Sequence, residues 1–115
     1  MPYLKINTNV SVNEQQCTEM LNRFSKLLAS ETAKPERYVV VELNAGKPMA
    51  FAGSTGPLAF LECKSIGLST AQAKSLSASL SKLLTETWQI PGDRIYIEFA
   101  NSPAEYWGWN GATFG

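Results

Sequence analysis

The sequence predicts an α+β fold in which two βαβ repeats form one four-stranded mixed sheet with two helices on the same face. Three observations predict it: strand-like segments, two helix patterns with one apolar face, and a repeat of this order in the second half of the chain. A length of 115 residues is typical of one domain, so we assign residues 1–115 to a single domain.

The repeat occurs at one constant offset. Residues 25–28 (SKLL) recur as residues 81–84, and at the same offset Pro35 corresponds to Pro91. A match of four residues is weak evidence, but a helix end, a proline and a strand that share one offset indicate duplication of a βαβ unit. The corresponding strand segments are 39–43 (VVVEL) and 95–99 (IYIEF).

The first repeat begins with residues 3–10 (YLKINTNV), whose alternation of apolar and polar side chains predicts a β-strand. Residues 11–14 (SVNE) match a capping box, which favours a helix start there. Apolar side chains then recur every three or four positions, so one helix face is buried, and Pro35 ends the helix. These apolar positions are Cys17, Met20, Leu21, Phe24, Leu27 and Leu28.

A second strand is predicted over residues 38–43 (YVVVEL), which are rich in β-branched side chains. Residues 46–48 (GKP) predict a turn, residues 49–51 (MAF) a short strand, and residues 52–57 (AGSTGP) a loop. The first half of the chain is therefore expected to run strand, helix, strand.

The second half follows the same order. Residues 58–66 (LAFLECKSI) predict a strand, and residues 69–72 (STAQ) form a second capping-box pattern. Residues 91–93 (PGD) predict a turn before a strand over 94–100 (RIYIEFA), and the aromatic segment 107–114 (WGWNGATF) could hold a short terminal strand. The helix between them is indicated by its apolar positions Ala73, Leu76, Leu80, Leu83, Leu84 and Trp88.

Two right-handed βαβ units leave one face of the sheet without helices. On the strand of residues 38–43, Val39, Val41 and Leu43 share one face, while Val40 and Glu42 share the other. We interpret these strands as too apolar for water, so we expect the bare face and the open edges to be covered by further copies of the chain. The pattern therefore predicts a symmetric oligomer.

Composition excludes several functions. Ten Lys and Arg balance ten Asp and Glu, so electrostatic binding to nucleic acid or to a membrane surface is not expected. The chain has no histidine, which excludes a Ser-His-Asp triad and nearly every zinc site, and we expect no metal or cofactor. No signal peptide or membrane span is recognisable, which predicts a cytoplasmic protein and leaves leaderless secretion open.

Pro2 is the first candidate for chemistry. If Met1 is removed, Pro2 becomes a secondary amine on a rigid ring. An α-amine has a pKa of roughly 7.7–8.0 in water, and burial lowers it, so a buried amine can accept a proton near neutral pH. The alternative is that Pro2 simply begins a strand, and its position alone does not decide between the two.

A set of scattered positions, in order from end to end, matches one known pattern: Met1-Pro2, Asn7-Thr8-Asn9, Lys34-Pro35, Tyr38, Met49-Ala50-Phe51, Gly53-Ser54, Ser65-Ile66-Gly67, Asp93-Arg94, Tyr96, Gly108-Trp109-Asn110 and Thr113-Phe114. In these positions the chain resembles the macrophage migration inhibitory factor family of the tautomerase superfamily. This resemblance implies a homotrimer of the predicted fold, with active sites at the subunit boundaries. It also implies keto–enol tautomerisation of phenylpyruvate-like acids, with the amine of Pro2 as the base.

The resemblance also implies further site residues. Lys34 would hold the substrate carboxylate, although a lysine near a helix end is more often solvated. Ser65 and Ile66 would border the site, with the Ile66 N–H contacting substrate, and Tyr96 would come from a neighbouring subunit. The alternative for Ser65 and Ile66 is an ordinary strand end, and the alternative for Tyr96 is an ordinary tyrosine within a strand. An aromatic wall for the substrate ring, or simple core packing, is expected of Tyr38, Trp109 and Phe114.

Three departures from the family pattern stand out. Glu98 replaces an asparagine, and a carboxylate there would repel an acidic substrate and raise the pKa of the proline amine. Lys64 replaces a histidine and could offset Glu98 or point to solvent. The Cys-x-x-Cys of the animal cytokine is replaced by residues 58–61 (LAFL), so its thiol oxidoreductase activity should be missing.

Three hypotheses follow. The first is a trimeric tautomerase acting on a small enol or keto acid. The second is a cytokine-like binding protein whose pocket is vestigial, although no residue identifies a receptor, and the third is a plain assembly module. Assaying enol-to-keto conversion with the wild type and a Pro2→Ala variant separates the first from the others.

Overall fold

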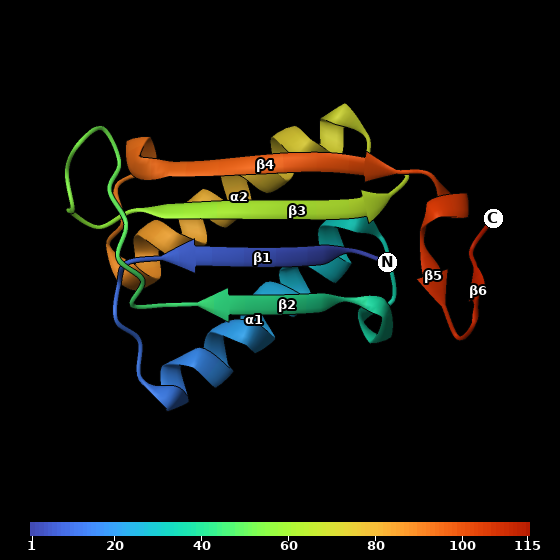
Figure 1. Ribbon diagram of the computed structural model, residues 1–115, viewed down its shortest axis with the longest axis horizontal. Helices are drawn as coiled ribbons and strands as arrows, with labels where there is room; N and C mark the ends of the chain where they lie inside the picture. The colour runs from blue at the N-terminus through green and yellow to red at the C-terminus, as the bar shows by residue number, and fades with distance from the viewer.

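Two βαβ units build the molecule, and the computed structural model describes residues 1–115 (Figure 1). The sheet has the strand order β2-β1-β3-β4, with β1 parallel to β2, β3 parallel to β4, and the two units joined by antiparallel pairing of β1 and β3. Both helices cover one face of this sheet (Figure 1), as predicted. The elements are β1 (Tyr3–Thr8), α1 (Glu14–Thr32), β2 (Val40–Asn44), β3 (Ala59–Ile66), α2 (Thr70–Trp88), β4 (Ile95–Ser102), β5 (Gly108–Trp109), β6 (Ala112–Thr113) and the short 3₁₀ turns η1 (Glu36–Tyr38), η2 (Gly92–Arg94) and η3 (Ala104–Tyr106).

Both helices begin with a capping box, but the first box lies two residues later than predicted. The Asn13 side chain accepts the Gln16 N–H at 2.8 Å, and the Gln16 side chain accepts the Asn13 N–H at 3.3 Å. The later start leaves Val12 outside the helix, where it packs against the core. In α2 the predicted pair is confirmed, because Ser69 and Gln72 cap each other at 3.1 and 3.0 Å.

The core lies between the helices and one face of the sheet. The alternate residues Leu4 and Ile6 of β1 point toward the helices and are fully buried. The helix positions predicted to be apolar face them, although Cys17, Leu21 and Leu27 are only half-buried. The buried helix side chains are Met20, Phe24, Leu28, Leu76, Leu80, Leu84 and Trp88.

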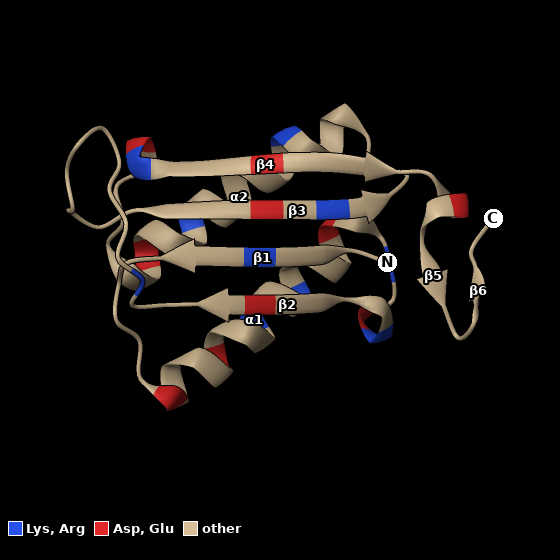
Figure 2. Cartoon of the chain, viewed as in Figure 1, with Lys and Arg blue, Asp and Glu red and all other residues tan.

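The open face of the sheet is mixed: charged side chains cross its middle, and Val40, Phe60 and Tyr96 expose apolar surface on it. The expectation that further copies of the chain cover this face stays a prediction. In β2, Val41 and Leu43 pack against the helix-covered core, as does Val39 just before the strand. Because successive side chains of a strand point to opposite faces, these three apolar side chains face the helices and Glu42 faces outward. Figure 2 shows charged positions side by side across the middle of the strands. The charged residues of this face are Lys5, Glu42, Glu62, Lys64 and Glu98.

Several predicted boundaries are wrong. Residues 3–10 pair as a strand only to Thr8, and the predicted strand 38–43 begins at Val40, because Tyr38 belongs to η1. Residues 49–51 form no strand; Phe51 makes only an isolated bridge to Ser54. Strand β4 continues to Ser102, two residues beyond its expected end.

Candidate active site around Pro2

A cavity of about 300 Å³ lies where the amino terminus meets the C-terminal hairpin. The start of β1 and the β5–β6 hairpin lie at the same end of the sheet (Figure 1). Turn η1 contributes one wall and the hairpin contributes the other. The lining residues are Met1, Pro2, Arg37, Tyr38, Val40, Trp107, Gly108, Trp109 and Phe114.

Pro2 is buried and its backbone is held in the sheet. The Val40 N–H donates to the Pro2 carbonyl at 3.0 Å, which extends the pairing of β1 with β2 by one residue. While Met1 is attached, the Pro2 nitrogen is an amide without basic character. Loss of Met1 would place a secondary amine at this position, beside the cavity.

The surroundings of the amino terminus favour an uncharged amine. Burial lowers the pKa of the terminal amino group below its ordinary value, and the positive charge of Lys34 lowers this pKa further. No carboxylate lines the cavity, so no lining side chain opposes these two effects. The cavity therefore suits an uncharged base and an anionic ligand.

Three aromatic rings, all predicted from the sequence as a wall, meet at this cavity. The ring centroids of Trp109 and Phe114 are 5.9 Å apart and the rings are stacked, with 15° between their planes. Tyr38 meets both edge-on, at 6.0 Å from Trp109 and 6.2 Å from Phe114. These edge-to-face contacts stabilise a rigid apolar surface against which a planar ring can pack.

Lys34, Ser65 and Ile66 lie at the same end of the sheet but do not line the cavity. Lys64 pairs with Tyr3 in the antiparallel pairing of β3 with β1. Ser65, the next residue of β3, therefore lies level with Pro2. It is buried, and its hydroxyl donates to the Ile66 carbonyl at 3.4 Å.

Tyr96 is not brought to Pro2 within one chain. It pairs with Phe60, which pairs with Asn7, so it lies toward the opposite end of the sheet. Its ring centroid is 4.7 Å from that of Phe51, and it lines a separate apolar hollow of about 380 Å³.

Glu98 and Lys64 also lie outside the Pro2 cavity. Both side chains are exposed on the open face, where Glu98 pairs with Glu62 on the neighbouring strand. Lys64 pairs with Tyr3 and so lies closer to the amino terminus than Glu98 does.

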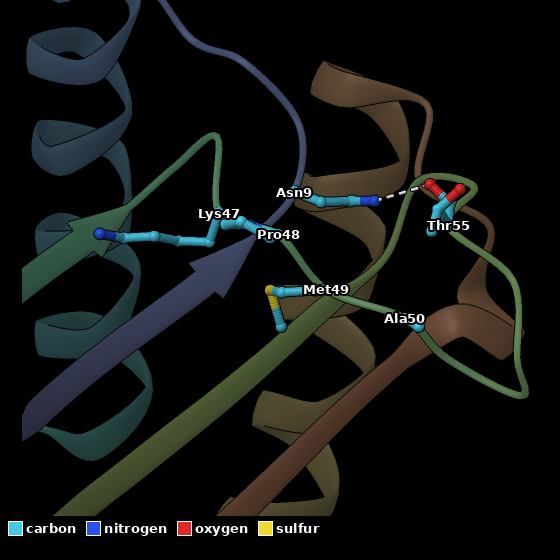
Figure 3. Close-up of a pocket in the computed structure, with 6 residues that line it drawn as sticks. All are labelled: Asn9, Lys47, Pro48, Met49, Ala50 and Thr55. Atoms are coloured by element: carbon cyan, nitrogen blue, oxygen red, sulfur yellow. Dashed lines mark hydrogen bonds between the residues drawn. The ribbon is translucent and has the colours of Figure 1, made fainter.

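Two further hollows, both larger than the Pro2 cavity and the Tyr96 hollow, lack this convergence of groups. One, of about 520 Å³, is lined by the segment around Pro48, and there the Asn9 amide donates to the Thr55 carbonyl at 2.9 Å while Lys47 points away from the other residues (Figure 3). The other, of about 530 Å³, is a groove between α1 and α2 lined by surface side chains such as Arg23 and Lys82. Their ionisable side chains, Lys47 in the first and Lys26, Lys82 and Glu86 in the second, are exposed and have no aromatic wall beside them, so we place the candidate site at Pro2.

Sequence reasoning missed Arg37, Val40 and Trp107, which line the cavity with the predicted residues. Arg37 directly precedes Tyr38, and its guanidinium lies over the Tyr38 ring at 4.8 Å from the centroid. A cation next to a predicted wall residue was the signal that could have identified it. No group of three His, Cys, Asp or Glu side chains is arranged to hold a metal ion, and neither helix combines the length and apolarity that a membrane span requires.

The comparisons with known proteins agree with this geometry. The sequence pattern of the family described as macrophage migration inhibitory factor (MIF) matches residues 1–115. A macrophage migration inhibitory factor homolog from Brugia malayi is 39% identical over 116 residues, covering 100% of both chains. The macrophage migration inhibitory factor of Xenopus tropicalis is 37% identical over 115 residues, covering 99% of each.

Solved structures extend the likeness to the fold. The crystal structure of a macrophage migration inhibitory factor homologue from Prochlorococcus marinus superimposes with a TM-score of 0.92 at 38% identity, covering 98% of this chain and 99% of that one. The macrophage migration inhibitory factor of Trichinella spiralis superimposes with a TM-score of 0.88 at 34% identity, covering 97% and 99%. The chain therefore belongs to the macrophage migration inhibitory factor family of the tautomerase superfamily.

Proposed function

We propose that this protein is a keto–enol tautomerase for phenylpyruvate-like 2-oxo acids, with the Pro2 amine, freed by removal of Met1, as general base. The observation that carries the proposal is a buried proline beside a cavity with three packed aromatic rings and no lining carboxylate. Small second residues such as proline normally permit removal of the initiator methionine.

The proposed reaction moves protons only. In the keto-to-enol direction, the neutral amine removes a proton from the carbon next to the carbonyl. The electrons of that C–H bond form the C=C bond, the carbonyl oxygen takes a proton from water as it becomes the enol hydroxyl, and the proline ammonium then returns its proton to water. In the opposite direction, the proline ammonium returns a proton to this carbon. The pyrrolidine ring holds the lone pair of the nitrogen in one direction.

The substrate would be held by groups that surround Pro2. Lys34 would bind the carboxylate, helped by the Ile66 N–H, and the substrate ring would pack on Tyr38, Trp109 and Phe114. A cation beside the carboxylate also keeps the amine uncharged, as the lowered pKa of the terminal amino group indicates.

We further propose a homotrimer in which one protomer completes the site of the next. Tyr96 lies toward one end of the sheet and Pro2 at the other, so only a neighbouring copy can bring a Tyr96 side chain to a Pro2 cavity. The same arrangement would bring Glu98 of that copy toward the substrate, since Tyr96 and Glu98 share the open face of β4.

The test compares three proteins in an assay of phenylpyruvate enol-to-keto conversion. Mass spectrometry first verifies that Met1 is absent from the wild type. A protein with an uncleaved N-terminal tag, which caps the Pro2 nitrogen, is expected to lose about 100- to 10,000-fold in kcat/KM, because general-base catalysis contributes that much. The same tag at the C-terminus is the control, and Pro2→Ala tests the ring. Full activity of the capped protein would refute the proposal.

The relatives' names point to the alternative, a cytokine-like protein-binding module with weak or vestigial tautomerase activity. The same assay separates the two functions. If the wild type without Met1 converts phenylpyruvate no faster than buffer does, the binding module becomes the better account.

A further inference from the structure

Arg37 is the only charged side chain that lines the Pro2 cavity, and it has no acidic partner. The two ion pairs of the chain join Lys26 to Glu36 and Lys82 to Glu86, each at 3.9 Å. Glu36, the carboxylate next to Arg37 in sequence, is therefore engaged elsewhere. No side-chain hydrogen bond occupies the guanidinium either, so all of its donors are free to bind an anion.

The guanidinium has a defined position on the aromatic wall. It lies over the Tyr38 ring at 4.8 Å, and Tyr38 in turn contacts Trp109 and Phe114 edge-on. A guanidinium stacked on a ring is held in place without losing its donors, which lie in its own plane. A substrate ring on this wall would therefore have a fixed cation beside it.

Arg37 and Lys34 act at different parts of the site. The charge of Lys34 lowers the pKa of the terminal amino group, whereas Arg37 is not among the causes of that shift. Arg37 lines the cavity and lies over the Tyr38 ring, whereas Lys34 lies outside the lining, so the two cations occupy different positions around Pro2. Two separated cations can bind two anionic groups at opposite ends of one molecule.

We propose that Arg37 is a specificity-determining residue that binds a second carboxylate, so that the preferred substrates are aromatic 2-oxo acids with a carboxylate at the far end of the ring. This inference rests on the proposed tautomerase function. Arginine suits the role because its planar fork binds a carboxylate through two parallel hydrogen bonds. If Glu98 of a neighbouring copy lies beside the cavity, it adds one negative charge, whereas Lys34 and Arg37 supply two positive charges.

The test uses a pair of substrates that differ in one group, phenylpyruvate and para-carboxyphenylpyruvate. The measured quantity is the ratio of their kcat/KM values. Arg37→Gln is expected to lower the dicarboxylate-to-monocarboxylate ratio about 10- to 100-fold, mainly through KM, because hydrogen bonds to charged groups contribute that much. Arg37→Lys should restore part of the ratio. Arg23→Gln, a charge change in the groove between α1 and α2, should leave the ratio as in the wild type.

An equal loss for both substrates would overturn the proposal, since Arg37 would then only hold Tyr38 in place. A binding measurement keeps the inference testable if neither substrate turns over. Quenching of tryptophan fluorescence compares phenylacetate with para-carboxyphenylacetate. Tighter binding of the dianion by the wild type, lost in Arg37→Gln, supports the proposal, and equal discrimination by the two proteins refutes it. Absence of turnover by itself refutes only the tautomerase function.

Discussion

The proposed chemistry depends on the amino group at the start of the chain. Two physical effects act on this group, which belongs to Met1 before Met1 is removed. Burial penalises the ammonium form, and the positive charge of Lys34 penalises it again. Both effects lower the pKa, so the fraction of uncharged amine at neutral pH is larger than for an amine in water. Pro2 lies next to this group and would replace it after removal of Met1.

Replacing Lys34 by Gln is expected to move the acidic limb of the pH–activity profile to higher pH. A base is active above its pKa, and loss of a nearby cation raises the pKa of an amine, so the variant would need higher pH for the same fraction of free base. The measurement is kcat/KM for phenylpyruvate against pH. Lys26→Gln, which removes an exposed lysine of α1, serves as the control. An unmoved acidic limb would show that Lys34 does not influence the base.

At the scale of elements, both helices end on a non-glycine residue in the left-handed conformation. Ala33 has φ 55° and Gln89 has φ 57°, values that a side chain with a Cβ adopts at a cost. The Ala33 N–H nevertheless bonds to the last turn of α1, so the conformation closes the helix. Strain is stored at each end because neither position is a glycine.

Ala33→Gly is therefore expected to stabilise the protein by about 1 kcal/mol and to raise the thermal midpoint by a few degrees. Calorimetry at a fixed protein concentration measures the midpoint. The matched control is Ala78→Gly in the exposed middle of α2. This change should destabilise the protein by about 1 kcal/mol, because glycine makes the unfolded chain more flexible and relieves no strain in the helix. A lower midpoint for Ala33→Gly would contradict the account of strain.

Arg94, at the end of η2, holds the loop of residues 51–57 against the start of β4. Its guanidinium donates to four carbonyls at 2.9–3.2 Å and lies over the Phe51 ring. Phe51 in turn packs on Tyr96, so the arginine positions the apolar hollow that contains Tyr96. The four carbonyls belong to Phe51, Ser54, Gly56 and Pro57.

Arg94→Lys is expected to loosen this loop and to cost about 1–3 kcal/mol, because an ammonium cannot reach carbonyls on opposite sides of a planar fork. Hydrogen exchange of the Phe51 and Ser54 amides, which bond to each other's carbonyls, should become faster. Arg23→Lys is the control, since its guanidinium has one hydroxyl contact, to Thr87 at 3.4 Å. Unchanged exchange in the loop would rule out the role of Arg94.

At the scale of the whole molecule, the two ends of the sheet carry different halves of the proposed site. The Pro2 cavity lies at one end, and the hollow with Tyr96, which is 62% exposed, lies toward the other. In the proposed homotrimer, each Tyr96 hollow would lie beside the Pro2 cavity of the next copy. The charged side chains across the middle of the open face, Glu98 among them, would then lie near the neighbouring copies.

Glu98→Asn is expected to raise kcat/KM for phenylpyruvate at neutral pH by about 2- to 10-fold, because a carboxylate near the site repels the substrate and favours the ammonium form of the base. Glu62→Gln removes the neighbouring carboxylate of the open face and is the control. Light scattering should show a mass of three chains for all three proteins. No gain with Glu98→Asn, or an equal gain with Glu62→Gln, would refute a specific effect of Glu98.

The sequence by itself determined the order of the elements and the two helix faces, because side-chain periodicity and capping act between residues close in the chain. The candidate residues of the wall came from the resemblance to a known family and not from any local pattern. It did not determine which sheet face the helices cover: the valines of the β2 segment lie on both faces with only one charged residue, and only packing against the helices shows which set is buried. The Pro2 cavity was likewise decided by tertiary structure. Pro2, Arg37 and Trp109 meet there from distant parts of the chain, and no local pattern encodes a contact between segments that only the folded sheet brings together.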